Sequence, residues 1–189
     1  MDETRRSDRT RAAILTAARA EFAKSGFQSA TVRTIAADAG VDPALVIRYF
    51  GSKEQLFQAA LDIRLELPDL TAVPADRLGE QVIRHFAGKW EDETFREASI
   101  FLFRTAMTNE IAAERMRAVF REQVIPHVAS LLADPAEAEQ RAAAVMTQLL
   151  GLGACRYVIG VPPLVELEID TLAARFGPTI QRYLTAELG

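Results

Sequence analysis

Apolar side chains recur every three or four residues along most of the chain, which is the spacing of one face of an α-helix. The first helix is predicted over residues 8–24, with Gly26 just past its end. No stretch bounded by turn residues alternates strictly between apolar and polar positions, as a half-buried strand would. The pattern therefore predicts an all-α fold of about nine helices.

Two short helices follow, and residues that cap helices mark their ends. Thr31 is a favoured N-cap residue and Gly40 suits a helix end, so one short helix is predicted between them. Asp42 followed by Pro43 gives an N-cap and then a proline at the first helical position, where a missing backbone N–H costs nothing. A third helix is predicted from Pro43, and Gly51 ends it.

The fourth predicted helix and the loop after it divide the chain. The run Ser52-Lys53-Glu54-Gln55 is a serine-to-glutamine capping box, which opens a helix predicted to continue to Leu67 and to stop at Pro68. The loop from Pro68 to Pro74 is the predicted domain boundary. Five more helices are predicted beyond it, over residues 75–90, 94–107, 110–132, 135–161 and 169–188. The helix over 110–132 is expected to kink where Pro126 removes a backbone N–H.

The two short helices are joined in a way that predicts a helix-turn-helix. The run Ala36-Ala37-Asp38-Ala39-Gly40-Val41 places small residues where two steeply crossing helices approach each other, and a glycine in the turn. Residues 43–48 then keep one exposed face, which can enter the major groove of DNA. On this pattern alone, the corner of an ordinary helical bundle is the alternative. The predicted inward anchors are Ile35, Val41, Val46 and Phe50.

The charge distribution favours a polyanionic partner at one end of the chain. The formal net charge is −4, but residues 1–53 hold nine Arg or Lys against six Asp or Glu. A basic head on an acidic body suits a protein that presents one end to nucleic acid. A basic arm consists of Arg5 and Arg6, before the first predicted helix, with Arg9 and Arg11 at its start. It either lies on phosphates or in a minor groove, or is a solvated tail.

Other classes of function lack their residue patterns. One cysteine, Cys155, and two histidines, His85 and His127, give no zinc-type ligand spacing, so neither a metal nor a cofactor is predicted. The chain has no nucleophile–base set and no phosphate-binding glycine loop, and we expect that it is not an enzyme. No run approaches the roughly 18 consecutive apolar residues of a membrane span. A cytoplasmic protein is predicted.

The segment TVRTIAADAGVDPALVIRYFGSKEQLFQAAL resembles the DNA-binding signature of the TetR family of transcriptional regulators. The likeness covers about residues 9–62 and lies in order and spacing: Ile-Ala, then Ala-Gly-Val, then the aromatic pair Tyr49-Phe50, then Gly51-Ser52-Lys53-Glu54. A looser similarity to one subfamily extends over residues 151–188. The resemblance implies a helix-turn-helix DNA-binding domain over 1–51, a connecting helix over 52–67 and a ligand-binding and dimerisation domain over 68–189.

The resemblance also implies a function and a set of DNA contacts. The implied function is a ligand-responsive transcriptional repressor, released from a palindromic operator by an apolar or amphipathic small molecule; the alternative is a helical small-molecule-binding or interaction protein without specific DNA binding. The third helix is expected to face base edges with Pro43, Ala44, Leu45, Ile47 and Arg48. Phosphate or base contacts are expected from Thr31, Arg33, Tyr49 and Lys53.

Leu45 and Ile47 depart from the family pattern, because many members have a threonine-like residue at the first position and a polar aromatic at the second. An apolar side chain can read only the thymine methyl group in the major groove. We therefore expect methyl contacts to contribute to recognition; the alternative is that one of the two side chains turns inward. Arg33 and Arg48 are the long donors expected to read guanine.

The remaining two-thirds of the chain is rich in aromatic residues and methionine, which can line an apolar ligand cavity or fill an ordinary core. The candidate ligand residues are Phe86, Trp90, Phe103, Arg104, Met107, Phe120, His127 and Cys155. The last two predicted helices are apolar on more than one side, which indicates either a homodimer interface or closure of the chain's own core. The candidate interface residues are Met146, Leu150, Tyr157, Phe176, Ile180 and Tyr183.

Overall fold

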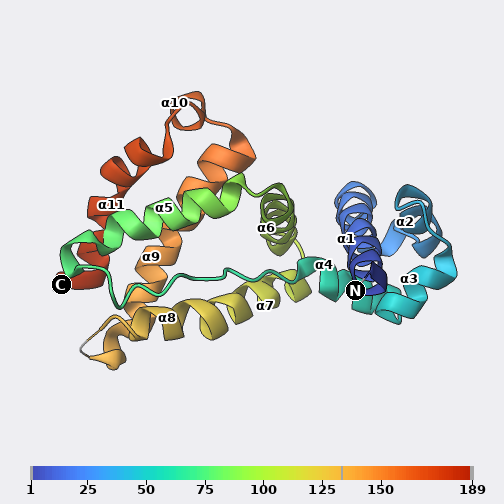
Figure 1. Cartoon of the computed structure of the whole chain (residues 1–189), viewed down its shortest axis with the longest axis horizontal. Coiled ribbons are helices and arrows are strands. Elements are labelled where there is room, and N and C mark those ends of the chain that lie inside the picture. Colours follow the sequence, from blue (N-terminus) through green and yellow to red (C-terminus); the bar gives the residue numbers. More distant parts are fainter. Residues whose placement is uncertain (1, 133, 188–189) are drawn as a thin grey trace. The chain divides into compact units, whose positions relative to one another are not determined.

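The computed structural model describes residues 2–132 and 134–187. Within these ranges there is no strand, so the predicted all-α fold is confirmed. The chain forms two compact units, and both are built from segments that are separate in sequence. Unit 1 comprises Met1–Ile63 and Glu97–Arg115, and unit 2 comprises Arg64–Arg96 and Met116–Gly189. Figure 1 shows the helices of each unit.

Unit 1 contains the first four helices together with most of α6 and part of α7. The bounds of these helices are α1 Asp2–Ser29, α2 Val32–Asp38, α3 Pro43–Phe50, α4 Lys53–Leu61, α6 Glu93–Ala106 and α7 Glu110–Val119. Regular α1 geometry is interrupted at Gly26, whose φ of 73° is the positive value that favours glycine. The predicted helix stop at Gly26 is confirmed, and one further helical turn follows it.

Two predicted boundaries in unit 1 are wrong. Helix α1 begins at Asp2 and not near residue 8, so the basic arm is helical and is not a solvated coil. Helix α4 ends at Leu61, six residues before the predicted end at Leu67. From residue 61 to 67, apolar and polar residues alternate, and the apolar ones are buried or half-buried while the polar ones are exposed. The chain leaves the helix at Leu61, in keeping with this period of two, and Glu66 turns it with a φ of 47°.

An aromatic cluster joins the helices of unit 1. The Phe57 ring of α4 meets the Phe22 ring of α1 edge to face, with centroids 5.0 Å apart, and the Phe101 ring of α6 lies 6.2 Å from Phe57. Such edge-to-face pairs add to the gain from apolar burial. Arg19 is buried beside them and its Nε donates to the Ala60 carbonyl, 3.0 Å away, in the last turn of α4. Helices α1, α4 and α6 therefore share one core.

Unit 2 is built around the crossing of α5 and α11. Its elements are a short helical turn at Ala75–Arg77, α5 Leu78–Glu91, a π-turn at Phe120–Val124, α8 Ile125–Ala129, a turn at Pro135–Glu137, α9 Ala138–Gly153, a π-turn at Ala154–Ile159, α10 Pro162–Val165 and α11 Ile169–Thr185. The π-turn at Phe120–Val124 interrupts the predicted helix over 110–132 directly before the predicted kink site Pro126. The predicted last residue of the final helix, Leu188, lies outside the described residues.

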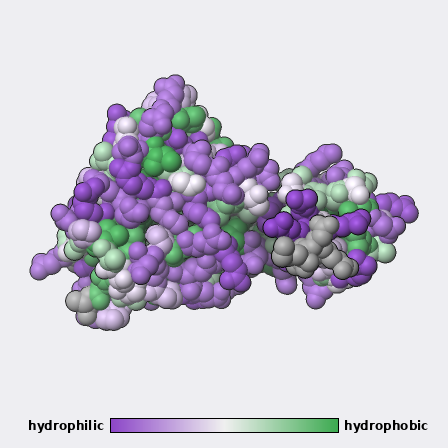
Figure 2. All heavy atoms as spheres, viewed as in Figure 1, coloured by the Kyte–Doolittle hydropathy of each residue, from purple (hydrophilic) through white to green (hydrophobic). Residues whose placement is uncertain are grey.

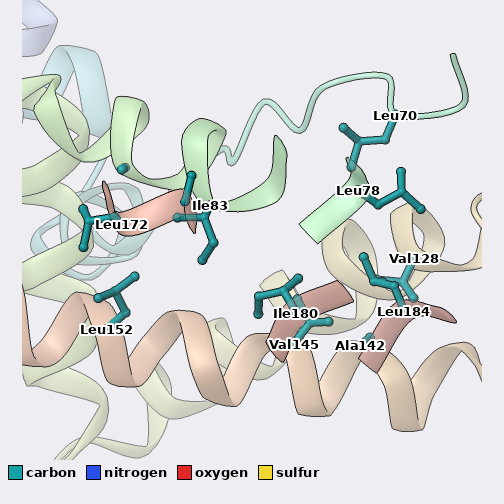
Figure 3. Packing of buried hydrophobic residues seen from close by; sticks show 12 residues of the cluster. Leu70, Leu78, Ile83, Val128, Ala142, Val145, Leu152, Leu172, Ile180 and Leu184 are labelled. Carbon is teal, nitrogen blue, oxygen red and sulfur yellow. The ribbon is translucent and has the colours of Figure 1, made fainter. Parts of the chain in front are cut away.

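The close approach of α5 and α11 depends on two glycines. A Cβ placed on Gly79 would lie 2.2 Å from the Gly177 carbonyl oxygen, so only a residue without a side chain fits there. The Gln181 side chain completes the crossing, because its Oε1 accepts from the Gly79 N–H at 2.8 Å and its Nε2 donates to the Ala75 carbonyl at 2.6 Å. Figure 3 shows the side chains that pack around this crossing: Leu70, Leu78, Ile83, Val128, Ala142, Val145, Leu152, Leu172, Ile180 and Leu184.

The segment Pro135–Ile159, which contains α9, is long and apolar enough to cross a membrane by length and composition, and 22% of its most apolar window is buried in the unit. Its one buried arginine, Arg141, donates to the Tyr183 and Ala186 carbonyls at 2.7 and 2.9 Å and pairs with Glu137 at 2.6 Å. These bonds fix α9 to the end of α11. Figure 2 shows apolar side chains among polar ones on the surface near α10, where Ile159 is 70% exposed.

Candidate nucleic-acid interface

Side-chain caps fix the ends of the short helices in unit 1. Thr31 Oγ1 accepts from the Thr34 N–H at 3.1 Å, which opens α2. Asp42 Oδ1 accepts from the Ala44 N–H at 2.7 Å, which opens α3. Ser52 Oγ accepts from the Gln55 N–H at 3.2 Å and opens α4. Each cap satisfies a backbone donor that the helix itself leaves free, and all three predicted caps are confirmed.

The turn between α2 and α3 has the predicted helix-turn-helix geometry. Gly40 adopts a φ of 66°, and the Val41 N–H donates back to the Ala36 carbonyl at 2.9 Å. Ala36 has no exposed surface, which agrees with its predicted place at the close approach of the two backbones. Three of the four predicted anchors are buried, and Val41 is half-buried. The buried anchors are Ile35, Val46 and Phe50.

The opposite face of α3 is open to solvent. Pro43, Ala44, Ile47 and Arg48 are exposed, and Ile47 retains 44% of its surface. Leu45 is half-buried, so it is the one of the two apolar residues that turns partly inward. Ile47 is one of the exposed large apolar residues of the described chain, and its contact with DNA stays a prediction.

The two candidate guanine readers are free to reach outward. Arg33 is exposed on α2, and Arg48 is exposed at the end of α3, where its guanidinium lies 5.8 Å from the centre of the Tyr49 ring. Arg11, from the basic part of α1, lies over the Phe50 ring at 5.2 Å. Arginine side chains that stack on aromatic rings lose less freedom on binding, because their planes are already held.

Two predicted phosphate ligands have partners within unit 1. Lys53 Nζ donates to the carbonyls of Phe27, Gln28 and Ala30 at 2.9 to 3.3 Å. It therefore caps the end of α1, and its ammonium has only three protons to donate. The Tyr49 hydroxyl donates to Ser7 Oγ at 3.0 Å. For both residues the geometry supplies a structural role, and phosphate contact stays a prediction.

The predicted ligand residues are divided between the units. Phe103, Arg104 and Met107 lie on or directly after α6, and Met107 is 67% exposed, which is not the setting of a cavity residue. Phe86 and Trp90 of α5 lie in unit 2, with ring centroids 5.7 Å apart. The other three candidates in unit 2 are half-buried: Phe120, His127 and Cys155.

Tyr157 belongs to this ring cluster, although the sequence placed it at the dimer interface. Its ring stacks on Trp90 with centroids 4.7 Å apart, and its hydroxyl is buried without a hydrogen-bond partner in the described structure. Burial raises the pKa of the Tyr157 phenol, and the Arg156 guanidinium beside it partly offsets this increase. Arg156 Nε is also buried and unpartnered. Neither polar atom could be found from the sequence, because their burial depends on the π-turn after α9.

The predicted dimer residues separate into two groups. Ile180 has no exposed surface and lies in the core of unit 2, so it cannot contribute contact area to a partner and its assignment to the interface is corrected. Phe176 and Tyr183 of α11 pack on that core but remain half-buried. Met146 and Leu150 of α9 are also half-buried.

A short, capped helix with an open face and flanking arginines, held across a tight glycine turn, defines a helix-turn-helix protein. Residues 14–60 match the family model "Bacterial regulatory proteins, tetR family", and residues 76–184 match "Tetracyclin repressor-like, C-terminal domain". The chain belongs to the TetR family of bacterial regulatory proteins. The resemblance noted in the sequence is thereby confirmed.

Individual relatives agree with this family. A TetR-family regulator from Streptomyces coelicolor A3 is 34% identical, with a TM-score of 0.58 over 94% of this chain and 95% of that one. The HTH-type transcriptional repressor Rv3405c of Mycobacterium tuberculosis is 42% identical over 77 residues, which span 39% of this chain and 41% of the relative. SmeT in its complex with triclosan shares the fold, with a TM-score of 0.63 at 24% identity over 93% of this chain and 90% of that one.

Proposed function

We propose that the protein is a ligand-responsive transcriptional repressor that binds an operator through the exposed face of α3. The observation that carries this proposal is the open surface of α3 itself: a rigid, capped helix leaves Ile47 and Arg48 outside the core. A helix of this length fits the major groove, where arginine reads guanine and an apolar side chain reads a thymine methyl group. The alternative is a helical binding protein that retains the corner without specific DNA binding.

Operator binding tests the two functions against each other. Labelled duplexes from the DNA that flanks the protein's own coding region are titrated by fluorescence anisotropy at fixed salt, because phosphate contacts make affinity depend on salt. We expect one duplex to bind in preference to the others. Arg48→Ala should weaken that binding by about 1 to 3 kcal/mol, whereas Arg175→Ala, an exposed arginine of α11, should leave it unchanged. Equal affinity for all duplexes would favour the alternative.

Methyl reading by Ile47 has its own test within the same assay. Replacing operator thymines by deoxyuridine removes the methyl group and keeps every hydrogen-bonding edge. We expect one or more of these replacements to weaken binding by the wild type and to have little further effect on the Ile47→Ala variant. Unchanged affinity at every position would rule out methyl contacts.

The effector site that we propose lies in unit 2, around Trp90 and Tyr157. A buried polar atom without a partner costs about 1 to 3 kcal/mol, and the Tyr157 hydroxyl and Arg156 Nε are two such atoms beside an aromatic surface. An amphipathic molecule that stacks on the rings and bonds to these atoms would gain from both. The complex of SmeT with triclosan supports an effector of this kind. Binding of such an effector beside Trp90 would change the fluorescence of that residue. Trp90 is the chain's single tryptophan, so the change can be assigned to this site.

We further propose a cytoplasmic homodimer that binds a palindromic operator. A twofold dimer presents two α3 helices to half-sites about 34 to 36 Å apart. The segment Pro135–Ile159 supports this assembly, because it is apolar and most of its residues are only half-buried or exposed within their own unit. Met146 and Leu150 are the α9 residues that a partner would cover. Sedimentation that shows only monomer at micromolar concentration would contradict the dimer.

A further inference from the structure

A groove of about 590 Å³ lies within unit 1, away from the α3 face. It is partly open to solvent and is lined by α1, α6 and the turn after α6, with Phe57 of α4. Sites for small molecules occupy about 300 to 1,000 Å³ and combine apolar walls with a few polar groups. The groove has the size and, as its lining shows, the chemistry of such a site.

The apolar wall of the groove consists of the rings that join the helices of unit 1. Phe22, Phe57 and Phe101 line it and are 4%, 2% and 5% exposed, and the half-buried ring of Phe27 lies beside Phe22 and Phe57. On the α1 side, Ala20 and Ala23 present only methyl groups, so no long side chain of these two positions fills the groove. A flat aromatic or alkyl group that enters between α1 and α6 would therefore meet the Phe27 ring first, with the buried rings behind it.

The charged residues of the lining do not cancel. Arg19 is 9% exposed, and its Nε is bonded to the Ala60 carbonyl. Burial lowers the pKa of Arg19, while the nearby carboxylates of Glu97 and Asp62 raise it. These two acids therefore compensate the positive charge of Arg19. Arg104 is exposed on the same groove and has no ion pair in the described structure. The lining thus offers a cation without a counter-charge beside an aromatic wall.

We propose that this groove binds a small amphipathic anion, whose apolar part packs on the phenylalanine rings of the lining, Phe27 foremost, and whose acidic group meets Arg104. The site is separate from the effector site proposed around Trp90, since every lining residue belongs to unit 1. An occupant touches both α1, which supports the helix-turn-helix, and α6. A regulatory effect on operator affinity follows from this contact and rests on the proposed function.

The experiment uses 1-anilinonaphthalene-8-sulfonate, which joins an aromatic body to a sulfonate, and N-phenyl-1-naphthylamine, which has the same rings without the charge. The full-length protein is labelled at isoleucine δ-methyl groups, and each compound is titrated without DNA while the Ile100 resonance is followed by NMR. Ile100 lines the groove and is half-buried. We expect a saturable shift of this resonance, and an affinity for the sulfonate about fivefold or more above that for the uncharged compound.

Variants separate the groove from other sites on the protein. Ala23→Phe fills the groove and should abolish the Ile100 shift, whereas Ala13→Phe, at an exposed position on α1 outside the lining, should not. Arg104→Gln should weaken sulfonate binding about fivefold and leave the uncharged compound unaffected, with Arg175→Gln as the matched control. An unshifted Ile100 resonance, or equal behaviour of the paired variants, overturns the site. Because no DNA is present, these results do not depend on operator binding. The regulatory effect alone is refuted if the sulfonate binds and operator affinity stays the same.

Discussion

The corner of α2 and α3 and the crossing of α5 and α11 solve the same problem, the close packing of two helices, in different ways. At the corner, the contact is between neighbours in sequence, and polar caps and a positive-φ glycine set its geometry. At the crossing, Gly79 meets Gly177, almost one hundred residues later in the chain, and each glycine is needed only because the other helix is there. The geometry of the corner is therefore determined by neighbouring residues in the sequence, whereas the geometry of the crossing depends on the whole unit.

The difference has a functional side. The corner fixes its backbone with few contacts, which leaves the outer surface of α3 free for a partner. The crossing has its residues buried on several sides, and Leu172 and Ile180 of α11 have no exposed surface. A substitution at the crossing should therefore change the free energy of unfolding, while a substitution on the open α3 face should change binding.

The largest stability effect is expected from Gly79→Ala. The added Cβ would lie 2.2 Å from a backbone oxygen of α11, and backbone cannot move aside without opening the crossing. Overpacking of this kind costs about 1 to 3 kcal/mol or more. The measurement is urea unfolding followed by circular dichroism.

Gly88→Ala is the control on the same helix, because nothing lies within 4 Å of a Cβ there. Alanine is the better helix former, so this variant should be more stable by about 0.5 to 1 kcal/mol. If the two alanine variants unfold alike, the tight approach of α5 to α11 is not what stabilises unit 2.

A smaller effect is expected from Asp42→Ala at the corner. The variant loses the cap on the Ala44 N–H, which should cost about 0.5 to 2 kcal/mol of unit 1 stability. Hydrogen exchange of the α3 amides reports the change. Asp38→Ala removes an exposed acid from the last turn of α2, where a negative charge opposes the helix dipole, and should cost nothing. Equal protection in the two variants would show that the corner is held by apolar packing alone.

The smallest effect concerns pH and belongs to unit 2. Burial lowers the pKa of both His85 and His127 below the ordinary value of 6.5, and the proximity of the two histidines adds to the effect at His127. The folded state therefore binds fewer protons than the unfolded state, and this contribution to stability is present above pH 6.5 and is lost as the pH falls below it. The urea concentration at the unfolding midpoint should decrease as the pH is lowered from 7.5 to 5.5.

The double variant with His85→Gln and His127→Gln serves as the control for this pH effect. Its urea midpoint should change less with pH across the same interval, whatever its absolute stability. A midpoint for the wild type that rises toward acid pH would contradict the expected direction of the pH dependence.

The sequence predicted the corner well because its signals are local. Thr31, Asp42 and Ser52 each act on an amide two or three residues away, so the residue type alone determines the bond. The same reasoning failed at the end of α4. There apolar and polar residues alternate after Leu61, and this period of two opposes the continuation of the helix that the spacing before it favours.

The candidate sites were less predictable because burial is a property of the assembled unit. Ile180 is apolar, as interface residues often are, but it has no exposed surface and lies in the core of unit 2. Lys53 was expected to contact phosphate, yet its ammonium donates hydrogen bonds to three carbonyls at and just after the end of α1. The partners that decide these roles come from distant segments, and periodicity within one helix contains no information about them.

The stack of Trp90 on Tyr157 makes unit 2 optically distinguishable from unit 1. Intrinsic tryptophan emission comes from this one stack, whereas far-ultraviolet circular dichroism sums the helices of both units. Melting curves recorded with the two signals would coincide for a single cooperative transition and separate if the units melt independently. The native chain therefore carries its own label for asking whether its halves unfold together.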